Sequence, residues 1–146
     1  GAYSAAEDNT NPLGQREDGA GYSKAIEGAL WVAKTPADSV QMVKTHGTGT
    51  PVNNAAEKTA LTRTLPEFVA TSYKPRIGHT MGASGLLETS LMLRDIKNGK
   101  LPAIQNRTAS DPVFVSEDTP VRGDKFISLA AGMGNIYSAA LFSTEV

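Results

Sequence analysis

Apolar side chains recur at the three- and four-residue spacing of an amphipathic helix in three segments of the chain. The first segment predicts a helix over residues 20–34, which Pro36 ends. The second predicts a helix capped by Asn53 or Asn54, and the third a largely buried helix over residues 83–96. In chain order, the apolar positions are Tyr22, Ile26, Ala29, Leu30, Ala33, Ala56, Ala60, Leu61, Leu65, Leu86, Leu87, Leu91, Leu93 and Ile96.

Short β-prone runs lie between and after these helices. Strands are predicted at residues 40–45, 68–74, 113–115, 126–131 and 136–142. The last two flank Gly132-Met133-Gly134, which predicts a turn between paired strands. Residues 1–19 are expected to be mostly irregular, because the polar stretch that ends there is rich in Asn, Gly and Asp. Helices that alternate with strands indicate an α/β fold, a sheet with helices packed on its faces.

Composition narrows the possible functions. The 146 residues fit a single domain, 1–146, with a formal net charge of -1. No basic patch points to nucleic acid and no apolar run of membrane-spanning length occurs, so neither partner is expected. With no targeting signal in view, a cytoplasmic location is expected. The chain has no cysteine, which excludes a disulfide, a thiolate metal site and a cysteine nucleophile within it.

The chain has two histidines, in similar local settings. His46 and His79 each follow a predicted strand, and each stands in a segment rich in Gly and Thr. Sites in α/β folds gather beyond the carboxyl ends of strands, so the pair is a candidate active site. The alternative is that each imidazole is only a structural hydrogen-bonding group. Zinc binding by the two histidines with Glu57 is not predicted, because their spacing matches no metal motif.

The segments around the histidines resemble a known family. Residues 46–51 (HGTGTP) look like the first histidine motif of elongating β-ketoacyl-acyl-carrier-protein synthases. Residues 74–85 (KPRIGHTMGASG), followed by residues 86–88 (LLE), resemble their Lys-x-x-x-Gly-His-x-x-Gly-Ala-x-Gly segment. The resemblance extends over residues 3–142 in the expected order. It implies the C-terminal half of a thiolase-like fold with a mixed sheet.

The resemblance also implies a reaction, a decarboxylative Claisen condensation by an acyltransferase. In this family a cysteine holds the acyl group, and the enolate formed from a malonyl thioester attacks that group. His46 and His79 are implied to donate Nε2 hydrogen bonds to the malonyl thioester carbonyl, which favours the enolate. A neutral imidazole suffices, and a neutral His79 is predicted because it precedes the N-terminus of a predicted helix.

Other site residues follow from the same resemblance. Lys74 is expected to pair with Glu57, which occupies the position of a family glutamate. Thr48 and Thr50 match positions that hold the phosphopantetheine arm, although turn chemistry explains them equally well.

Residues 131–134 (AGMG) lie where the family has a Phe-Gly-Phe-Gly-Gly loop. The Met133 N–H is therefore an implied oxyanion donor, next to Gly132, and its side chain an implied gate to the acyl pocket. Met133 replaces the usual gating phenylalanine and Asn54 the usual aspartate. These departures leave acyl selectivity open.

The nucleophilic cysteine of the family belongs to an N-terminal half that pairs with this one by pseudo-twofold symmetry. Three interpretations follow: a piece of a full ketosynthase, a natural subunit that docks onto a cysteine-bearing partner, or a non-catalytic carrier-protein or acyl-binding subunit. In the first two the chain alone is inactive, and it is expected to expose the apolar helix at residues 83–96. The expected partners are acyl carrier protein and the N-terminal half, in a homo- or hetero-oligomer, with no separate cofactor. Fatty-acid and polyketide pathways are not distinguished.

Overall fold

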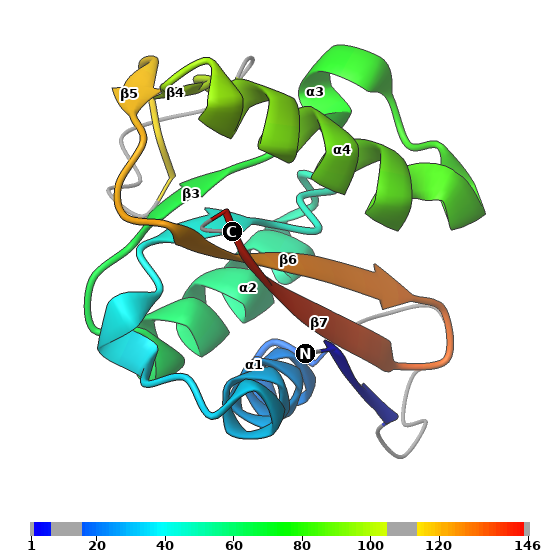
Figure 1. Cartoon of the computed structure of the whole chain (residues 1–146). Coiled ribbons are helices and arrows are strands. Elements are labelled where there is room, and N and C mark those ends of the chain that lie inside the picture. Colours follow the sequence, from blue (N-terminus) through cyan, green and yellow to red (C-terminus); the bar gives the residue numbers. More distant parts are fainter. Residues whose placement is uncertain (1, 7–15, 105–113, 145–146) are drawn as a thin grey trace.

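The computed structural model of the chain describes residues 2–6, 16–104 and 114–144 (Figure 1). The helices are α1 (Ala20–Ala33), α2 (Pro51–Thr64), α3 (Lys74–Ile77) and α4 (Ser84–Lys97), with short 3-10 helices η1 (Ala37–Ser39) and η2 (Met81–Ala83). The strands are β1 (Ala2–Ala6), β2 (Met42–Lys44), β3 (Val69–Thr71), β4 (Lys100–Leu101), β5 (Thr119–Pro120), β6 (Lys125–Gly132) and β7 (Ile136–Ser143).

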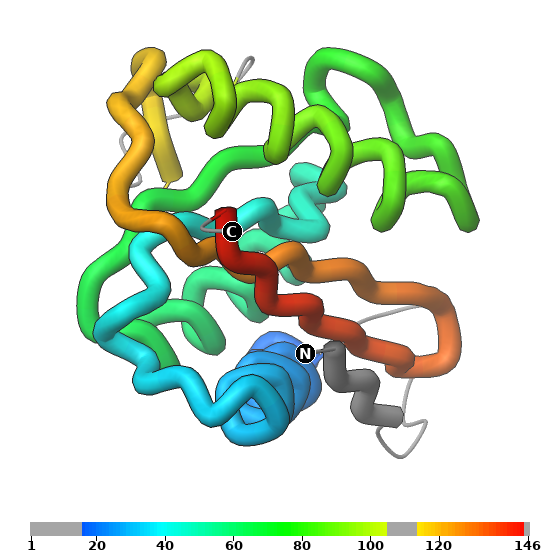
Figure 2. The backbone as a smooth tube through the Cα atoms, in the orientation of Figure 1, coloured from blue at the N-terminus to red at the C-terminus, as the bar shows by residue number. Residues whose placement is uncertain are grey.

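The main sheet is mixed, with five strands in the order β1-β7-β6-β2-β3. Strands β6, β2 and β3 are parallel, whereas β7 is antiparallel to both β6 and β1. Strands β4 and β5 form a separate two-stranded antiparallel sheet. Helices α1 and α2 cover one face of the main sheet and α4 the other, as the ribbon in Figure 1 and the backbone tube in Figure 2 show. The predicted α/β architecture is confirmed.

Each face of the sheet has its own apolar core. The core beneath α1 and α2 contains Tyr22, Ile26, Leu61, Ile127 and Leu129 among its buried side chains. The smaller core beneath α4 contains Met42, Tyr73, Met92, Leu101 and Phe126. Alternate residues of one strand serve the two cores, since Val43 faces the first and Met42 the second.

Helix α4 turns mostly polar residues toward the sheet and three of its leucines away from it. Its buried positions are Ser84, Glu88, Thr89, Met92 and Asp95. Leu86 is 79% exposed, and Leu87 and Leu93 are about 40% exposed. These leucines are exposed in the chain alone, as predicted, whereas the largely buried helix that the apolar pattern also predicts is not what this chain alone forms. An apolar surface of this kind on an otherwise folded domain is typical of an interface.

The start of α2 differs from the prediction. Thr50, rather than Asn53 or Asn54, is the N-cap, and its side chain accepts the Asn53 N–H at 3.4 Å. The reason is Pro51, whose fixed φ suits the first helical position and brings the helix start forward. Asn53 is instead buried, and its side chain bonds to Tyr22 on α1.

The strands also differ in extent. Residues 2–6, predicted as irregular, form an edge strand because β7 supplies antiparallel partners from the other end of the chain. The strand predicted at 68–74 is shortened to β3, since α3 begins at Lys74 with Pro75 in its first turn. Of the strand predicted at 113–115, residue 113 lies outside the described residues, and Phe114 forms only a bridge with Ala70. Within the described ranges, no helix is long and apolar enough to span a bilayer.

Candidate active site

The loop that carries His46 is held by a buried carboxylate. His46 and Gly47 follow β2, and their backbone N–H groups donate to the two Glu57 carboxylate oxygens at 2.5 and 2.8 Å. The Asn53 amide donates to the same carboxylate at 2.8 Å. Burial raises the pKa of Glu57, and these three hydrogen bonds oppose the rise. Glu57 therefore positions His46 through the backbone.

Gly47 is required by its surroundings. Its φ is 60°, and a Cβ atom at this position would lie 2.1 Å from the Ser72 Oγ. We expect Gly47→Ala to lower the free energy of unfolding by about 2–4 kcal/mol, since left-handed backbone strain and a steric clash add together. Gly49→Ala is the matched control, because Gly49 has a φ of 80° with open space around it. Urea denaturation of the two variants checks this, and equal losses would contradict it.

The prediction that Lys74 pairs with Glu57 is wrong. The Lys74 Nζ donates to the Glu88 carboxylate at 2.7 Å and to the His46 carbonyl, and it makes no ion pair with Glu57. The cause is the layering of the fold. Glu57 lies on α2 and is engaged by backbone N–H groups, whereas Lys74 faces Glu88 on α4, on the other side of the sheet.

A second lysine, absent from the predicted site, reaches the same carboxylate. Lys44 ends β2, and its Nζ donates to the other Glu88 oxygen at 3.1 Å. Both side chains of this ion pair are fully buried. Burial lowers the pKa of Lys44, and the Glu88 carboxylate opposes that shift. The available sequence signal was a single charged residue at the end of an apolar strand, two positions before His46.

The two histidines converge as predicted. Their ring centroids lie 5.6 Å apart, at an interplanar angle of 77°. The His46 Nδ1 accepts the Ala131 N–H at 3.2 Å, and the His79 Nδ1 accepts the Met81 N–H at 3.0 Å. An acceptor at Nδ1 is a neutral imidazole with its proton on Nε2. Both rings are thus oriented as Nε2–H donors.

The parallel strands bring these groups together. His46 follows β2, His79 lies beyond β3, and Ala131 is near the end of β6. Because these three strands are parallel neighbours, their carboxyl ends meet at one edge of the sheet. The prediction that each strand delivers one imidazole to a common site agrees with this geometry.

His46 is held in its neutral form by its environment. Burial, followed by the charges of Lys74 and Lys44 and the nearby His79 ring, lowers the pKa of His46 to about 3. In the unfolded chain, by contrast, the His46 side chain binds a proton near pH 6.5, where an unperturbed histidine titrates.

Acid should therefore destabilise the folded chain through His46. Protons bind the unfolded state first, so stability falls as pH drops below 6.5 toward 3. Relative to His46→Gln, the wild type should lose about 2 kcal/mol of unfolding free energy between about pH 7.5 and about pH 5. Urea denaturation at the two pH values measures this difference, and the variant cancels the titration of other groups. If the difference in unfolding free energy between wild type and His46→Gln is the same at both pH values, His46 is not a neutral, buried imidazole.

All the predicted site residues except Glu57 line one cavity of about 1050 Å³. Its wall includes His46, His79, Lys74, Thr48, Thr50, Gly132 and Met133, together with Lys44, Ser84 and Glu17. Glu57 is not part of this wall, since it lies behind the His46 loop. Met133, at the β6–β7 turn, is 72% exposed. Among the described residues, no three His, Cys, Asp or Glu side chains are grouped to hold a metal.

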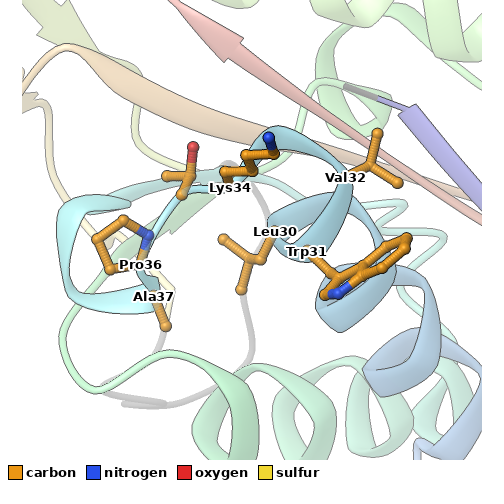
Figure 3. A pocket seen from close by; sticks show the side chains of 7 residues that line it. Leu30, Trp31, Val32, Lys34, Pro36 and Ala37 are labelled. Atoms are coloured by element: carbon orange, nitrogen blue, oxygen red, sulfur yellow. The ribbon is translucent and has the colours of Figure 1, made fainter.

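A second hollow of about 690 Å³ lies at the C-terminal end of α1 (Figure 3). Its lining is mostly apolar and includes Trp31, which is 81% exposed, Leu30 and Pro36. Of the described residues that line it, Lys34 alone has an ionisable side chain, so these residues offer no paired groups for acid–base or nucleophilic chemistry.

Comparison with known proteins agrees with this geometry. Residues 1–108 match the family described as "Beta-ketoacyl synthase, C-terminal domain". The tetracenomycin polyketide synthase ketoacyl synthase alpha subunit of Streptomyces glaucescens is 31% identical over 139 residues, covering 89% of this chain and 33% of that protein. The mitochondrial 3-oxoacyl-[acyl-carrier-protein] synthase of Arabidopsis thaliana is 28% identical over 127 residues, covering 83% of this chain and 28% of that protein.

Solved structures show the same fold. A β-ketoacyl synthase from Burkholderia phymatum STM815 superposes with a TM-score of 0.88 at 25% identity, covering 98% of this chain and 36% of that one. The ketosynthase of a type II polyketide synthase, solved with its acyl carrier protein and bound to the hexaketide, gives 0.90 at 20% identity, covering all of this chain and 38% of that one. The chain thus belongs to the β-ketoacyl synthases, as a C-terminal domain with a thiolase-like fold. It spans about a third of the length of these relatives.

Proposed function

We propose that the chain supplies the decarboxylating half of a β-ketoacyl synthase active site. The observation that carries this proposal is the pair of imidazoles, His46 and His79, whose Nδ1 atoms are both engaged by backbone N–H groups. Two Nε2–H donors then face one cavity with rings 5.6 Å apart. This spacing suits two hydrogen bonds to a single carbonyl oxygen.

In the proposed reaction, the carbonyl of a malonyl thioester accepts both Nε2–H bonds. The bond between the α-carbon and the carboxylate breaks, carbon dioxide leaves, and the electron pair forms an enolate whose oxygen carries the charge. The enolate carbon then attacks an acyl thioester on a cysteine, and the cysteine thiolate leaves after a tetrahedral intermediate. The Met133 N–H is the proposed donor to that second oxyanion. Neutral donors avoid any proton transfer to the enolate oxygen.

The substrates are proposed to arrive on the phosphopantetheine arm of acyl carrier protein. Thr48 and Thr50 line the cavity with hydroxyl groups, and Thr50 also caps α2. These hydroxyls can bond to the amides of the arm. The structurally similar type II ketosynthase was solved with its acyl carrier protein, which supports a substrate carried on such a protein.

The missing cysteine is proposed to come from an N-terminal half, in the same polypeptide or in a partner subunit. The chain has no cysteine and spans about a third of its relatives. The leucines that α4 turns outward would pack against that half, as Leu86 at 79% exposure suggests. Without it, the chain holds the enolate-forming groups but no nucleophile and should be inactive.

The test is to mix the chain with a cysteine-bearing N-terminal half and to measure release of carbon dioxide from malonyl-acyl carrier protein. Either half alone should show no condensation, and the mixture should gain both decarboxylation and condensation. A half with its cysteine replaced by alanine is the control for condensation. No activity with any cysteine-bearing half would reject the proposal and would favour a carrier-protein or acyl-binding subunit.

A further inference from the structure

Packing alone does not require a lysine at position 44. It lies on the same face of β2 as Met42, which belongs to the apolar core under α4. Its side chain is fully buried, and Glu88 is its hydrogen-bond partner at 3.1 Å. An apolar residue would fill this position without the cost of desolvating an ammonium group.

Two buried lysines share the Glu88 carboxylate. Glu88 contributes one negative charge, and the ammonium groups of Lys44 and Lys74 bind its two oxygens at 3.1 and 2.7 Å. Glu57, the other buried carboxylate nearby, accepts the backbone N–H groups of His46 and Gly47, and its charge also acts on Lys44. Glu17 lines the same cavity but is exposed, so solvent screens its charge.

We propose that Lys44 is a positioning residue of the decarboxylation site: with Lys74 it fixes the Glu88 carboxylate from both sides, and it adds a second buried positive charge that acts on His46. This inference rests on the proposed function of the two imidazoles. The charges of Lys74 and Lys44 both act on His46, and both lower its pKa. A positive charge at this position disfavours an imidazolium and favours the enolate oxygen that the imidazoles bind.

Lys74 and Lys44 differ in their hydrogen bonds to the His46 loop. Lys74 also donates to the His46 carbonyl, so its removal would disturb the loop directly. Lys44 makes no bond to that loop and reaches His46 only through its charge and through Glu88. A Lys44 variant thus separates charge from loop geometry.

The first arm of the test needs neither a partner nor turnover. Histidine ¹⁵N shifts of the chain report protonation of His46 between about pH 3 and about pH 8. Lys44→Met and Lys44→Gln, which remove the charge, should raise the pKa of His46 by about one unit. Lys44→Arg should restore the wild-type value, and Lys97→Met, at an exposed position of α4, should leave it unchanged. The other titratable groups beside His46 are Lys74, His79 and Glu57, with Glu88 bound to Lys74, and these stay in place.

The second arm uses the chain assembled with the cysteine-bearing half. Lys44→Met should lower kcat for decarboxylation about tenfold with little change in KM, because the Lys44 side chain is fully buried and acts through Glu88 and through its charge. Lys44→Arg should recover most of the rate. An unchanged His46 titration in both neutral variants would overturn the inference, whatever the activity. An inactive wild-type mixture would reject the proposed function alone, since the titration still decides the role of Lys44.

Discussion

Replacing Glu88 with glutamine is expected to lower the free energy of unfolding of the chain by about 3–5 kcal/mol at neutral pH. Glu88 is fully buried, and its two oxygens bind the ammonium groups of Lys44 and Lys74. Glutamine keeps the shape but removes the charge, so two buried cations lose their counterion. Urea denaturation followed by circular dichroism measures the loss. Glu67→Gln, which breaks the exposed ion pair with Arg122, should cost less than about 0.5 kcal/mol.

The loss should also depend on pH. Burial already lowers the pKa of Lys44, and removal of the Glu88 carboxylate lowers it further. A lysine whose folded pKa lies below its unfolded value destabilises the fold until the pH approaches the unfolded value, near 10.4. The difference between wild type and Glu88→Gln should therefore shrink from about pH 7 to about pH 9.5. A loss under about 1 kcal/mol, or one that does not change with pH, would mean that the lysines are not charged as described.

Removing either imidazole is expected to lower the rate of malonyl decarboxylation in the assembled protein about 10²- to 10³-fold. The reason is that each Nε2–H is aimed at the oxygen where the enolate charge develops. His46→Ala and His79→Ala should each have this effect, and the double variant should lose less than the product of the two losses. Release of carbon dioxide from malonyl-acyl carrier protein is the measurement.

A second readout separates this role from a general loss of structure. Transfer of the acyl group to the cysteine of the other half involves no enolate, so both variants should retain it. Circular dichroism should show folded variants, most clearly for His79→Ala, because His79 is exposed. Loss of acyl transfer in parallel with decarboxylation would indicate a disturbed assembly and would contradict an enolate-specific role.

The fold was predictable where local patterns decide it. α1, α4 and the β6–β7 hairpin lie close to their predicted ranges, because apolar periodicity and turn residues are local signals. β1 was not predictable, since its pairing partner β7 lies at the opposite end of the chain. The cap of α2 was misplaced by three residues or more because Pro51 favours an earlier start than the asparagines suggest.

The site residues that belong to sequence motifs were predictable. The contacts that depend on which helix covers which face of the sheet were less so. His46, His79 and Lys74 line one cavity as the motifs indicate. The predicted ion pair between Lys74 and Glu57 was wrong, because Lys74 pairs with Glu88 on α4 instead. Linear spacing does not tell which face of a sheet a helix covers. Lys44 was missed since a charged residue at a strand end usually reaches solvent, whereas α4 covers this one.

The central claim is that two neutral imidazoles bind one thioester carbonyl. It is tested most directly by ¹⁵N NMR of the histidine-labelled chain, assembled with its cysteine-bearing half and titrated with a non-reactive malonyl-thioester analogue. The Nε2–H resonances of His46 and His79 should shift together at a single analogue concentration, while both Nδ1 resonances stay those of unprotonated acceptors. A shift confined to one ring, or a protonated Nδ1 on either, would contradict the claim.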